Sequence, residues 1–219
     1  MIIIQGKNVL ISLGGTFEPI DSVRGITNKS SGKMGLALAK QAYIQGANVT
    51  LVIANVSVEI SPLFKVIRVE TSKQMAEVIF DIVGDYDIFI STAAVSDFEV
   101  VDRRDKKISS DSSLSIDLKP TLKIIQQIKE INPDIFLVGF KAEFNITTDE
   151  IIYCARKQIS DAGTDLVIAN DVSKKNCNFG SDLNEVLIID SDVLSVPLSS
   201  KDEIAKIIIN VISNKTSSI

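Results

Sequence analysis

The stretch VLISLGGTFEPIDSVRGITNKSSGKMG, residues 9–35, decides how the whole chain is interpreted. It begins with a run at residues 9–13 that is apolar except for Ser12, and it ends where apolar residues return with helical spacing over residues 33–45. A short apolar run followed by a helical pattern predicts a buried strand that leads into a helix. The connection between the two is much longer than an ordinary turn, so it has room for a ligand site.

The same alternation continues through the rest of the sequence. Strands are expected at residues 9–13, 49–53, 66–69, 87–91, 136–140 and 166–169. Helices are expected at residues 33–45, 72–83, 122–131, 150–160 and 201–212. Continuously apolar strands that alternate with helices indicate a mostly parallel sheet with helices on both faces. We therefore expect an α/β chain with a three-layer, Rossmann-like fold.

The C-terminal part departs from this alternation. Residues 186–190 and 194–198 resemble the two strands of a C-terminal β-hairpin, and residues 214–219 are expected to fray. The chain has 219 residues, of which 45% are hydrophobic, and this is enough for a well-buried core. We interpret residues 1–219 as a single domain.

The composition excludes several functional classes. The chain has no histidine, which excludes Ser-His-Asp and Cys-His catalysis and the common histidine-containing zinc sites. Its net charge of −5 disfavours nucleic-acid binding through a broad basic face. Local lysines and backbone N–H groups can still bind a small anion. The chemistry must therefore use carboxylates, lysines, amides, hydroxyls, backbone dipoles or a bound ion.

The sequence also indicates where the protein works. No apolar run reaches the roughly 18 residues of a transmembrane helix, and residues 1–12 lack the basic leader and cleavage site of a signal peptide. Cys154 and Cys177 form no CxxC pair, and free thiols are typical of a reducing compartment. We expect a cytoplasmic protein that has no membrane partner.

The long connection after the first strand is a candidate phosphate and substrate loop. Its small and polar residues include Gly14, Gly15, Thr16, Ser30, Ser31, Gly32 and Lys33. Hydroxyls and a glycine at a helix start leave N–H groups free, and the helix dipole favours an anion there. Lys33 places a cation where the dipole disfavours one, and a bound phosphate would explain it. An ordinary N-cap with Lys33 in solvent explains the same residues equally well.

Other predicted strands also end in small or polar residues, and the carboxyl ends of parallel strands meet at one edge of a sheet. Asp97, soon after Ala93, fits either an Asx turn or a contact to a sugar, base or cation. Phe140 fits either a nucleobase contact or the core. Asn170 and Asp171 fit either turn formation or ligand contact. Their joint placement predicts one crevice.

Residues 102–113, DRRDKKISSDSS, form the most polar segment of the chain that we single out. They fit a solvated loop or a mobile flap whose lysines meet a ligand. Polarity by itself favours the loop.

These motifs resemble those of the phosphopantothenoylcysteine synthetases. Residues 14–35 are similar to the family's glycine-rich loop with its ID-x-VR-x-I-x-N-x-SSGKMG core, and AAVSD at 93–97 is similar to its AAVAD segment. GFKAE, DLVIAND and FGSDLNEV match later blocks in the same order, so the similarity spans residues 9–212. The resemblance implies a ligase of coenzyme A biosynthesis that joins 4′-phosphopantothenate to L-cysteine.

The resemblance also implies the mechanism and the partners. CTP activates the carboxylate as an acyl-cytidylate, pyrophosphate leaves, and the amine of cysteine then displaces CMP; the eukaryotic type uses ATP instead. Mg²⁺ is expected, held mainly by the nucleotide phosphates, and no protein ligands to it are assigned. The family forms homodimers, and the apolar C-terminal hairpin is a candidate contact. Many relatives are fused to a phosphopantothenoylcysteine decarboxylase, so the chain is either free-standing or the C-terminal half of a fusion.

Matching positions imply roles for individual residues. Asn28 is expected to orient the carbonyl of the acyl-nucleotide. Lys107 is expected to close over the site, so the resemblance favours the flap interpretation of residues 102–113. Nucleotide contacts are expected from Ala93, Asp97, Lys107, Leu122, Lys123, Ile124, Ile125 and Phe140.

The sequence departs from the family pattern at several positions. Ser109 and Ser110 stand where the bacterial flap has lysines, and Lys123 replaces an aspartate. Gln158 and Ala162 occupy two positions that are basic in the family. These departures weaken the preference for CTP over ATP, although CTP remains the expected nucleotide.

Two other functional classes fit the predicted fold. An NAD(P)-dependent oxidoreductase needs an acidic residue at the end of the second strand and a compact glycine turn. Here the second strand ends in Ile53, Ala54 and Asn55, and the connection is long. A nucleotide-binding regulatory module is the third possibility. Asn28 and Lys107 disfavour it, because sensing requires no amide that handles an acyl group.

Overall fold

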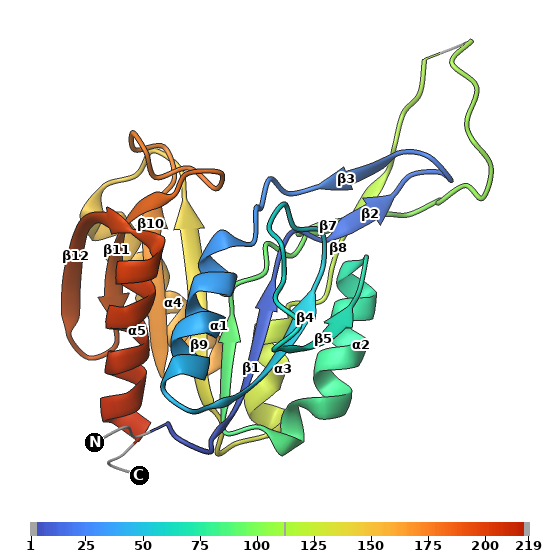
Figure 1. Ribbon diagram of the computed structural model, residues 1–219. Helices are drawn as coiled ribbons and strands as arrows, with labels where there is room; N and C mark the ends of the chain where they lie inside the picture. The colour runs from blue at the N-terminus through green and yellow to red at the C-terminus, as the bar shows by residue number, and fades with distance from the viewer. Residues whose placement is uncertain (1–3, 112, 217–219) are drawn as a thin grey trace.

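The computed structural model describes residues 4–111 and 113–216. They build an 8-stranded sheet with the order β12-β11-β10-β9-β6-β1-β4-β5 (Figure 1). The strands are β1 Asn8–Leu13, β4 Asn48–Ile53, β5 Lys65–Arg68, β6 Ile88–Ser91, β9 Phe136–Glu143, β10 Leu166–Asp171, β11 Leu183–Ile189 and β12 Val193–Ser200. Neighbours from β5 to β10 run parallel, whereas β11 and β12 are antiparallel. The predicted mostly parallel sheet is therefore confirmed.

Helices cover both faces of this sheet (Figure 1). The helices α1 Lys33–Ile44 and α5 Lys201–Thr216 lie on one face, and α2 Ser72–Ile82, α3 Ile124–Ile131 and α4 Thr148–Ala162 lie on the other. Side-chain alternation along β1 explains the two layers, because Val9 and Ile11 pack with α1 and α5. Leu10 points the other way and packs with α2 and α3. The three-layer prediction is confirmed.

The C-terminal hairpin is confirmed and is longer than predicted. Both of its strands join the main sheet, because β11 pairs with β10 as well as with β12. Strand β12 extends to Ser200 and forms one edge of the sheet, where most of its side chains are at least partly exposed. Polar residues are tolerated at such an edge, so the apolar run underestimates the length of the strand.

Some predicted helix ends are corrected. Helix α3 begins at Ile124, two residues later than predicted. Leu122 precedes the helix and its side chain is exposed. A 3-10 turn, η1 Val83–Asp85, follows α2. The expectation that residues 214–219 fray is wrong for 214–216, which belong to α5. Within this last turn Thr216 Oγ1 donates to the carbonyl of Ile212 at 3.0 Å. Residues 217–219 lie outside the described part of the chain.

An arm projects beyond the carboxyl ends of the strands in Figure 1; it includes most of the predicted flap, but its paired strands have no counterpart in the sequence prediction. It consists of residues 17–27, 98–111 and 113–120, and we call these segments the arm. Its strands are β2 Phe17–Pro19 paired with β3 Gly25–Thr27, and β7 Phe98–Val100 paired with β8 Leu118–Pro120. Each is a three-residue strand. Such short segments are too short to show a strand periodicity.

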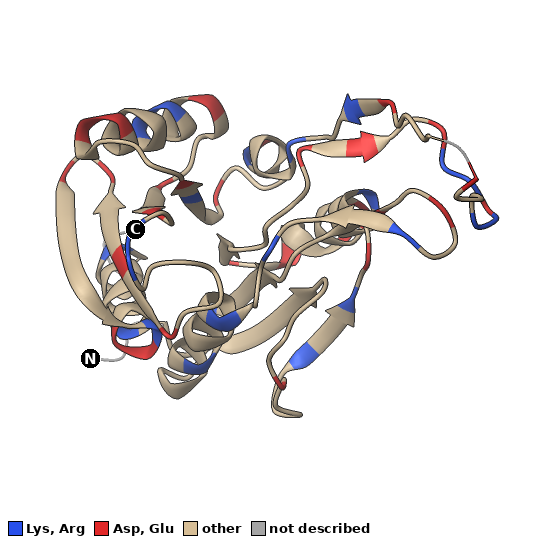
Figure 2. Cartoon of the chain, turned by 90° about the horizontal axis from the view of Figure 1, so that it is seen from above, with Lys and Arg blue, Asp and Glu red and all other residues tan. Residues whose placement is uncertain are grey.

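Charged residues of both signs are dispersed over the body and the arm (Figure 2). No helix in the described part of the chain has the length and apolar character needed to cross a membrane.

Candidate active site

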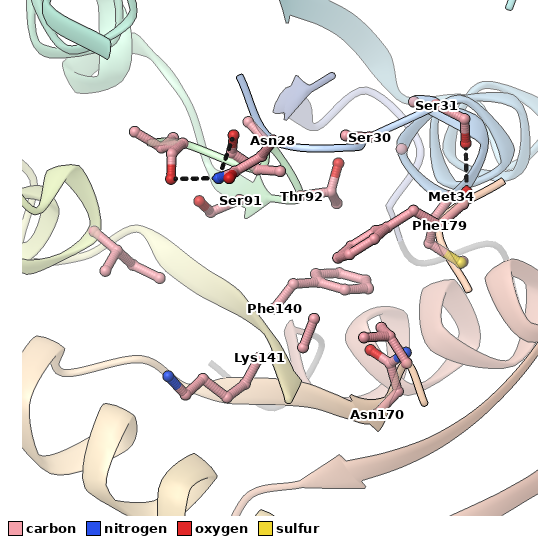
Figure 3. Close-up of a pocket in the computed structure, with 18 of the residues that line it drawn as sticks. Asn28, Ser30, Ser31, Met34, Ser91, Thr92, Phe140, Lys141, Asn170 and Phe179 are labelled. Atoms are coloured by element: carbon pink, nitrogen blue, oxygen red, sulfur yellow. Dashed lines mark hydrogen bonds between the residues drawn. The ribbon is translucent and has the colours of Figure 1, made fainter. Parts of the chain in front are cut away.

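A cavity of about 350 Å³ opens at the carboxyl ends of the parallel strands (Figure 3). Its wall is formed by the start of α1, the segment after β6, the start of α3, the end of β9 and the loop between β10 and β11. The structure brings together on this wall most of the residues predicted from the sequence. These are Asn28, Ser30, Ser31, Gly32, Lys33, Ala93, Asp97, Leu122, Lys123, Ile124, Ile125 and Phe140.

Gly14, Gly15 and Thr16 do not line the cavity, so their predicted place in the substrate loop stays a prediction. Gly15 N donates to the carbonyl of Asn55 at 2.9 Å, and Ala94 N donates to the carbonyl of Gly14 at 2.8 Å. The buried Thr16 hydroxyl accepts the N–H of Ser96 at 2.9 Å. These three residues therefore hold the segment after β6 in place without lining the cavity.

The start of α1 lacks the hydroxyl cap that the sequence suggested. Gly32 is the N-cap residue at φ 77°, and no side chain caps the helix. Only glycine adopts this conformation without strain. The Ser31 hydroxyl donates to the carbonyl of Phe179 at 2.6 Å, and its Oγ accepts the N–H of Lys33 at 3.4 Å. The first turn closes with Leu36 N donating to the Gly32 carbonyl at 3.0 Å, so the N–H groups of Met34 and Gly35 have no partner within the helix.

Lys33 is not simply exposed to solvent. Its Nζ donates to the Asp182 carboxylate at 2.6 Å and to the Gly180 carbonyl at 2.8 Å. The Lys33 ammonium lowers the pKa of the Asp182 carboxyl. In this structure Asp182 takes the place in which the sequence suggested a phosphate, and it holds the loop between β10 and β11 against α1.

Asn28 lies on the wall beside the segment that follows β6 (Figure 3). Its Nδ2 donates to the carbonyls of Ala94 and Val95 at 3.4 and 3.3 Å. These distances are long for hydrogen bonds, so a ligand can compete for the same protons. The two bonds orient the amide and leave its Oδ1 as an acceptor.

Asp97 and Lys123 form an ion pair with each other. Both side chains are more than half exposed, so the ion pair contributes little stability and exchanges easily. The segment behind Asp97 is fixed independently, because the Thr121 hydroxyl donates to the carbonyl of Ser96 at 2.6 Å. The structure thus explains the lysine at position 123 by a partner across the entrance.

Two aromatic side chains face the cavity from opposite segments (Figure 3). Phe140 stands near the end of β9 and is partly buried, and Phe179 lies on the loop before β11 with 39% of its surface exposed. Aromatic faces of this kind can stack on a planar base.

The structure separates the two alternatives for Asn170 and Asp171. Asn170 is 9% exposed, lines the cavity and donates from Nδ2 to Asn184 Oδ1 at 3.2 Å. Asp171 does not line the cavity, and its Oδ1 accepts the N–H groups of Asn145 and Ser173 at 3.0 and 2.8 Å. Asp171 therefore shapes the loop, and the pKa of its carboxyl is lowered chiefly by the Ser173 side chain and next by these backbone bonds.

Gln158 was noted in the sequence only as a departure from a basic residue. It lines the cavity from α4, and its Nε2 is a buried donor that has no partner among the described residues. A Cβ at Gly139 would lie 1.9 Å from this nitrogen, so β9 needs glycine there to admit the amide.

Lys201 was not identified from the sequence, although it lines the cavity and is only 8% exposed. It is the first residue of α5. A lysine at this place is disfavoured by the helix dipole, and this is the signal that sequence reasoning used for Lys33 and overlooked here.

Lys107 lies on the arm and not on the cavity wall, where it borders a shallow hollow with Lys106, Ile108 and Leu114. The Asp21 carboxylate fixes the adjoining backbone by accepting the N–H of Ile108 at 3.0 Å. Arg24, which is paired with Asp21, also donates to the Ile108 carbonyl at 2.7 Å. The structure therefore does not bring Lys107 together with Asn28, and its predicted catalytic contact remains a prediction.

No group of three or more Cys, Asp or Glu residues within residues 4–111 and 113–216 is arranged to hold a metal ion. Asp97 supplies a carboxylate at the cavity wall, where it is paired with Lys123.

The chain is similar in sequence to curated proteins of coenzyme A biosynthesis. The chain is 46% identical over 206 residues to the coenzyme A biosynthesis bifunctional protein CoaBC of Thermococcus kodakarensis, which covers 93% of this chain and 50% of that protein. It spans about half the length of the curated relatives of this kind.

Two solved structures have the same fold. The DNA/pantothenate metabolism flavoprotein from Streptococcus pneumoniae superposes with a TM-score of 0.85 at 29% identity, covering 96% of this chain and 100% of that one. The C-terminal domain of a CoaBC protein superposes with a TM-score of 0.84 at 29% identity and covers 100% of both chains. Residues 4–216 match the family model described as the DNA/pantothenate metabolism flavoprotein C-terminal domain. The chain belongs to this domain family, which confirms the resemblance seen in its motifs.

Proposed function

We propose that this chain forms the amide bond between 4′-phosphopantothenate and L-cysteine through a nucleotide-activated carboxylate. One observation carries the proposal: Asn28, the start of α1 and Phe140 share one cavity at the carboxyl ends of the strands. An amide, the N–H donors that a helix start leaves free and an aromatic face are what an acyl-nucleotide requires of its site. Membership in the domain family and the relatives' role in coenzyme A biosynthesis support the same substrates.

In the first step of this proposal, a carboxylate oxygen of phosphopantothenate attacks the α-phosphorus of CTP. The bond to the bridging oxygen of the β-phosphate breaks, and pyrophosphate leaves with the electron pair. In the second step the cysteine amine attacks the acyl carbon, loses a proton and displaces CMP. CMP is a far better leaving group than oxide, so activation makes an otherwise unreactive carboxylate electrophilic.

The residues of this chain bind and orient in both steps. Asn28 releases its long bonds to Ala94 and Val95 and donates from Nδ2 to the acyl carbonyl. The cavity wall excludes water, which would otherwise hydrolyse the mixed anhydride. Mg²⁺ bound to the nucleotide would offset phosphate charge, with Asp97 as the wall carboxylate available to it once Lys123 is displaced. Lys107 would reach the nucleotide only after the arm moves towards the cavity.

A homodimer is also part of this proposal. Exposed apolar side chains gather on the arm, which projects from the body (Figure 1), and they include Val23, Phe98, Val101, Leu114 and Leu118. Burial of such a patch against a second copy would stabilise the arm. The predicted contact through the hairpin is the alternative, because Val193, Leu194 and Leu198 on β12 are exposed as well. A mass measurement in solution on Val23→Ser and Leu194→Ser variants separates the two.

One assay tests the enzyme proposal. The purified chain is mixed with phosphopantothenate and either CTP or ATP, and pyrophosphate release is followed before and after cysteine is added. We expect pyrophosphate to require both substrates, and nucleoside monophosphate to appear only with cysteine, faster with CTP than with ATP. Absence of both products with either nucleotide would refute the ligase proposal, and faster turnover with ATP would refute the preference for CTP.

A further inference from the structure

Lys201 is a buried lysine to which the two steps above assign no task. It lines the cavity, and its Nζ donates to the carbonyls of Ser181 at 2.6 Å and Phe179 at 3.3 Å. In the described part of the chain, carbonyl dipoles and not a paired carboxylate neutralise this ammonium. Burying a charge in this way is costly, and neutral donors would hold the same carbonyls at lower cost.

A second lysine lies close to the first. The pKa of Lys201 is lowered mainly by burial and next by the positive charge of Lys33, against the opposing effect of Asp182. Lys33 is itself on the cavity wall. The Asp182 side chain that pairs with Lys33 is 85% exposed, so water weakens its attraction for both lysines. This end of the cavity therefore carries two cations and one weakly held carboxylate.

The backbone adds to the positive potential at the same place. Lys33 is the first residue of α1 and Lys201 is the first residue of α5, and the two helices lie side by side on one face of the sheet (Figure 1). The dipole of each helix disfavours a cation at its start. Two unfavourable lysines beside one cavity are explained together if a multiply charged anion binds between them.

We propose that Lys201 and Lys33 form a polyphosphate subsite, which binds the terminal phosphates of the nucleotide and then the pyrophosphate that leaves. This inference rests on the proposed ligase function and extends it to a residue outside the motifs. Phosphate oxygens replace the carbonyls of Phe179, Gly180 and Ser181 as acceptors for the two ammonium groups. The negative charge that develops on the leaving pyrophosphate is then stabilised by paired cations in a partly water-excluded site.

Inorganic pyrophosphate is the probe for this subsite. Its affinity is measured by calorimetry for the wild-type chain and for Lys201→Gln, Lys201→Arg and Lys206→Gln. Lys206 is an exposed lysine on the same helix, so its variant changes net charge without touching the cavity. We expect Lys201→Gln to weaken binding on the order of tenfold or more, as for loss of a charged hydrogen bond. Lys201→Arg should retain most of the affinity, and Lys206→Gln should match the wild type.

The thermal midpoint of each variant shows whether weaker pyrophosphate binding comes from unfolding or from loss of the subsite. If Lys201→Gln does not fold, Lys33→Gln serves as the second test, because that side chain is 30% exposed and tolerates a neutral replacement. Wild-type affinity in a folded Lys201→Gln or Lys33→Gln chain would overturn the inference, and so would a wild-type chain that does not bind pyrophosphate.

The titration requires neither phosphopantothenate nor cysteine, so the two proposals fail separately. Lysine-dependent pyrophosphate binding in a chain without ligase activity would refute the ligase proposal and support the subsite proposal. Ligase activity together with pyrophosphate binding that does not depend on the lysines would support the ligase proposal and refute the subsite proposal.

Discussion

Replacement of Gly15 by alanine tests how closely the long connection after β1 supports the cavity. A Cβ at Gly15 would lie 2.5 Å from the carbonyl oxygen of Asn28, whereas ordinary contact begins near 3.4 Å. The Asn28 backbone must therefore retreat by about 0.9 Å. The bonds from Asn28 Nδ2 to Ala94 and Val95 are already 3.4 and 3.3 Å long, so they break on this displacement.

Two separate losses are expected from this change. Overpacking of a tight site costs about 1–3 kcal/mol of unfolding free energy, which lowers Tm by roughly 2–4 °C for each kcal/mol in a chain of this size. Displacement of a positioned group by about 1 Å costs on the order of a hundredfold in rate. The turnover of Gly15→Ala, measured well below its Tm, should therefore fall far more than the folded fraction does.

Gly84→Ala is the matched control, because a Cβ at Gly84 meets nothing within 4 Å. It should leave turnover unchanged and leave Tm equal or slightly higher, since alanine restricts the unfolded chain. The reasoning is refuted if Gly15→Ala retains the Tm and turnover of the wild type, or if both glycine variants behave alike.

Four further predictions follow from individual contacts. The pKa of the Asp21 carboxyl lies well below its ordinary value of 3.8, chiefly because of Arg24 and next because of the Ile108 N–H, so the stability that this carboxylate gives the arm is present above pH 3.8 and is lost as the pH falls below it. Asp21→Asn should speed hydrogen exchange of the Ile108 amide at neutral pH, and an unchanged rate would show that Asp21 does not hold this amide. Gln158→Met removes a buried donor without a partner and should raise the unfolding free energy by about 1 kcal/mol; a lower Tm would show that the amide has a stabilising role. Lys107→Gln should raise KM for the nucleotide at constant Tm, and full activity would exclude a flap contact. Asn28→Asp should lower kcat by about a hundredfold with little change in Tm, whereas unchanged turnover would remove its assigned role.

The parallel part of the sheet was predictable because its strands are buried on both faces. Residues 166–169, for example, are continuously apolar, residues 9–13 are apolar except for Ser12, and the structure buries nearly all of them completely. The arm was not predictable in the same way. Its strands β2 and β7 gain stability from pairing and from contacts distant in sequence, and three residues carry no pattern that a window could detect.

The candidate site also contains residues that the sequence could predict and residues that it could not. Asp97 and Phe140 were singled out because they lie near the carboxyl ends of parallel strands, which meet at one edge of the sheet, whereas Asn28 was assigned only from the resemblance to the family. Gly14 to Thr16 were assigned to the ligand because small residues permit close approach, and in the structure that closeness serves backbone packing, so their contact with a ligand stays a prediction. Composition cannot tell whether a ligand or another strand end approaches a glycine.

The contacts that close the cavity join residues far apart in sequence. Ser31 reaches Phe179, and Lys33 reaches Asp182, across nearly 150 residues, while Lys201 meets the same loop from its other side. These bonds hold the loop in the absence of ligand, so a polyphosphate that takes over both lysines must also release the loop. The free energy of that release is subtracted from the binding energy of the nucleotide. A site built in this way couples capture of the leaving group to the position of Phe179, which local sequence patterns around either lysine do not reveal.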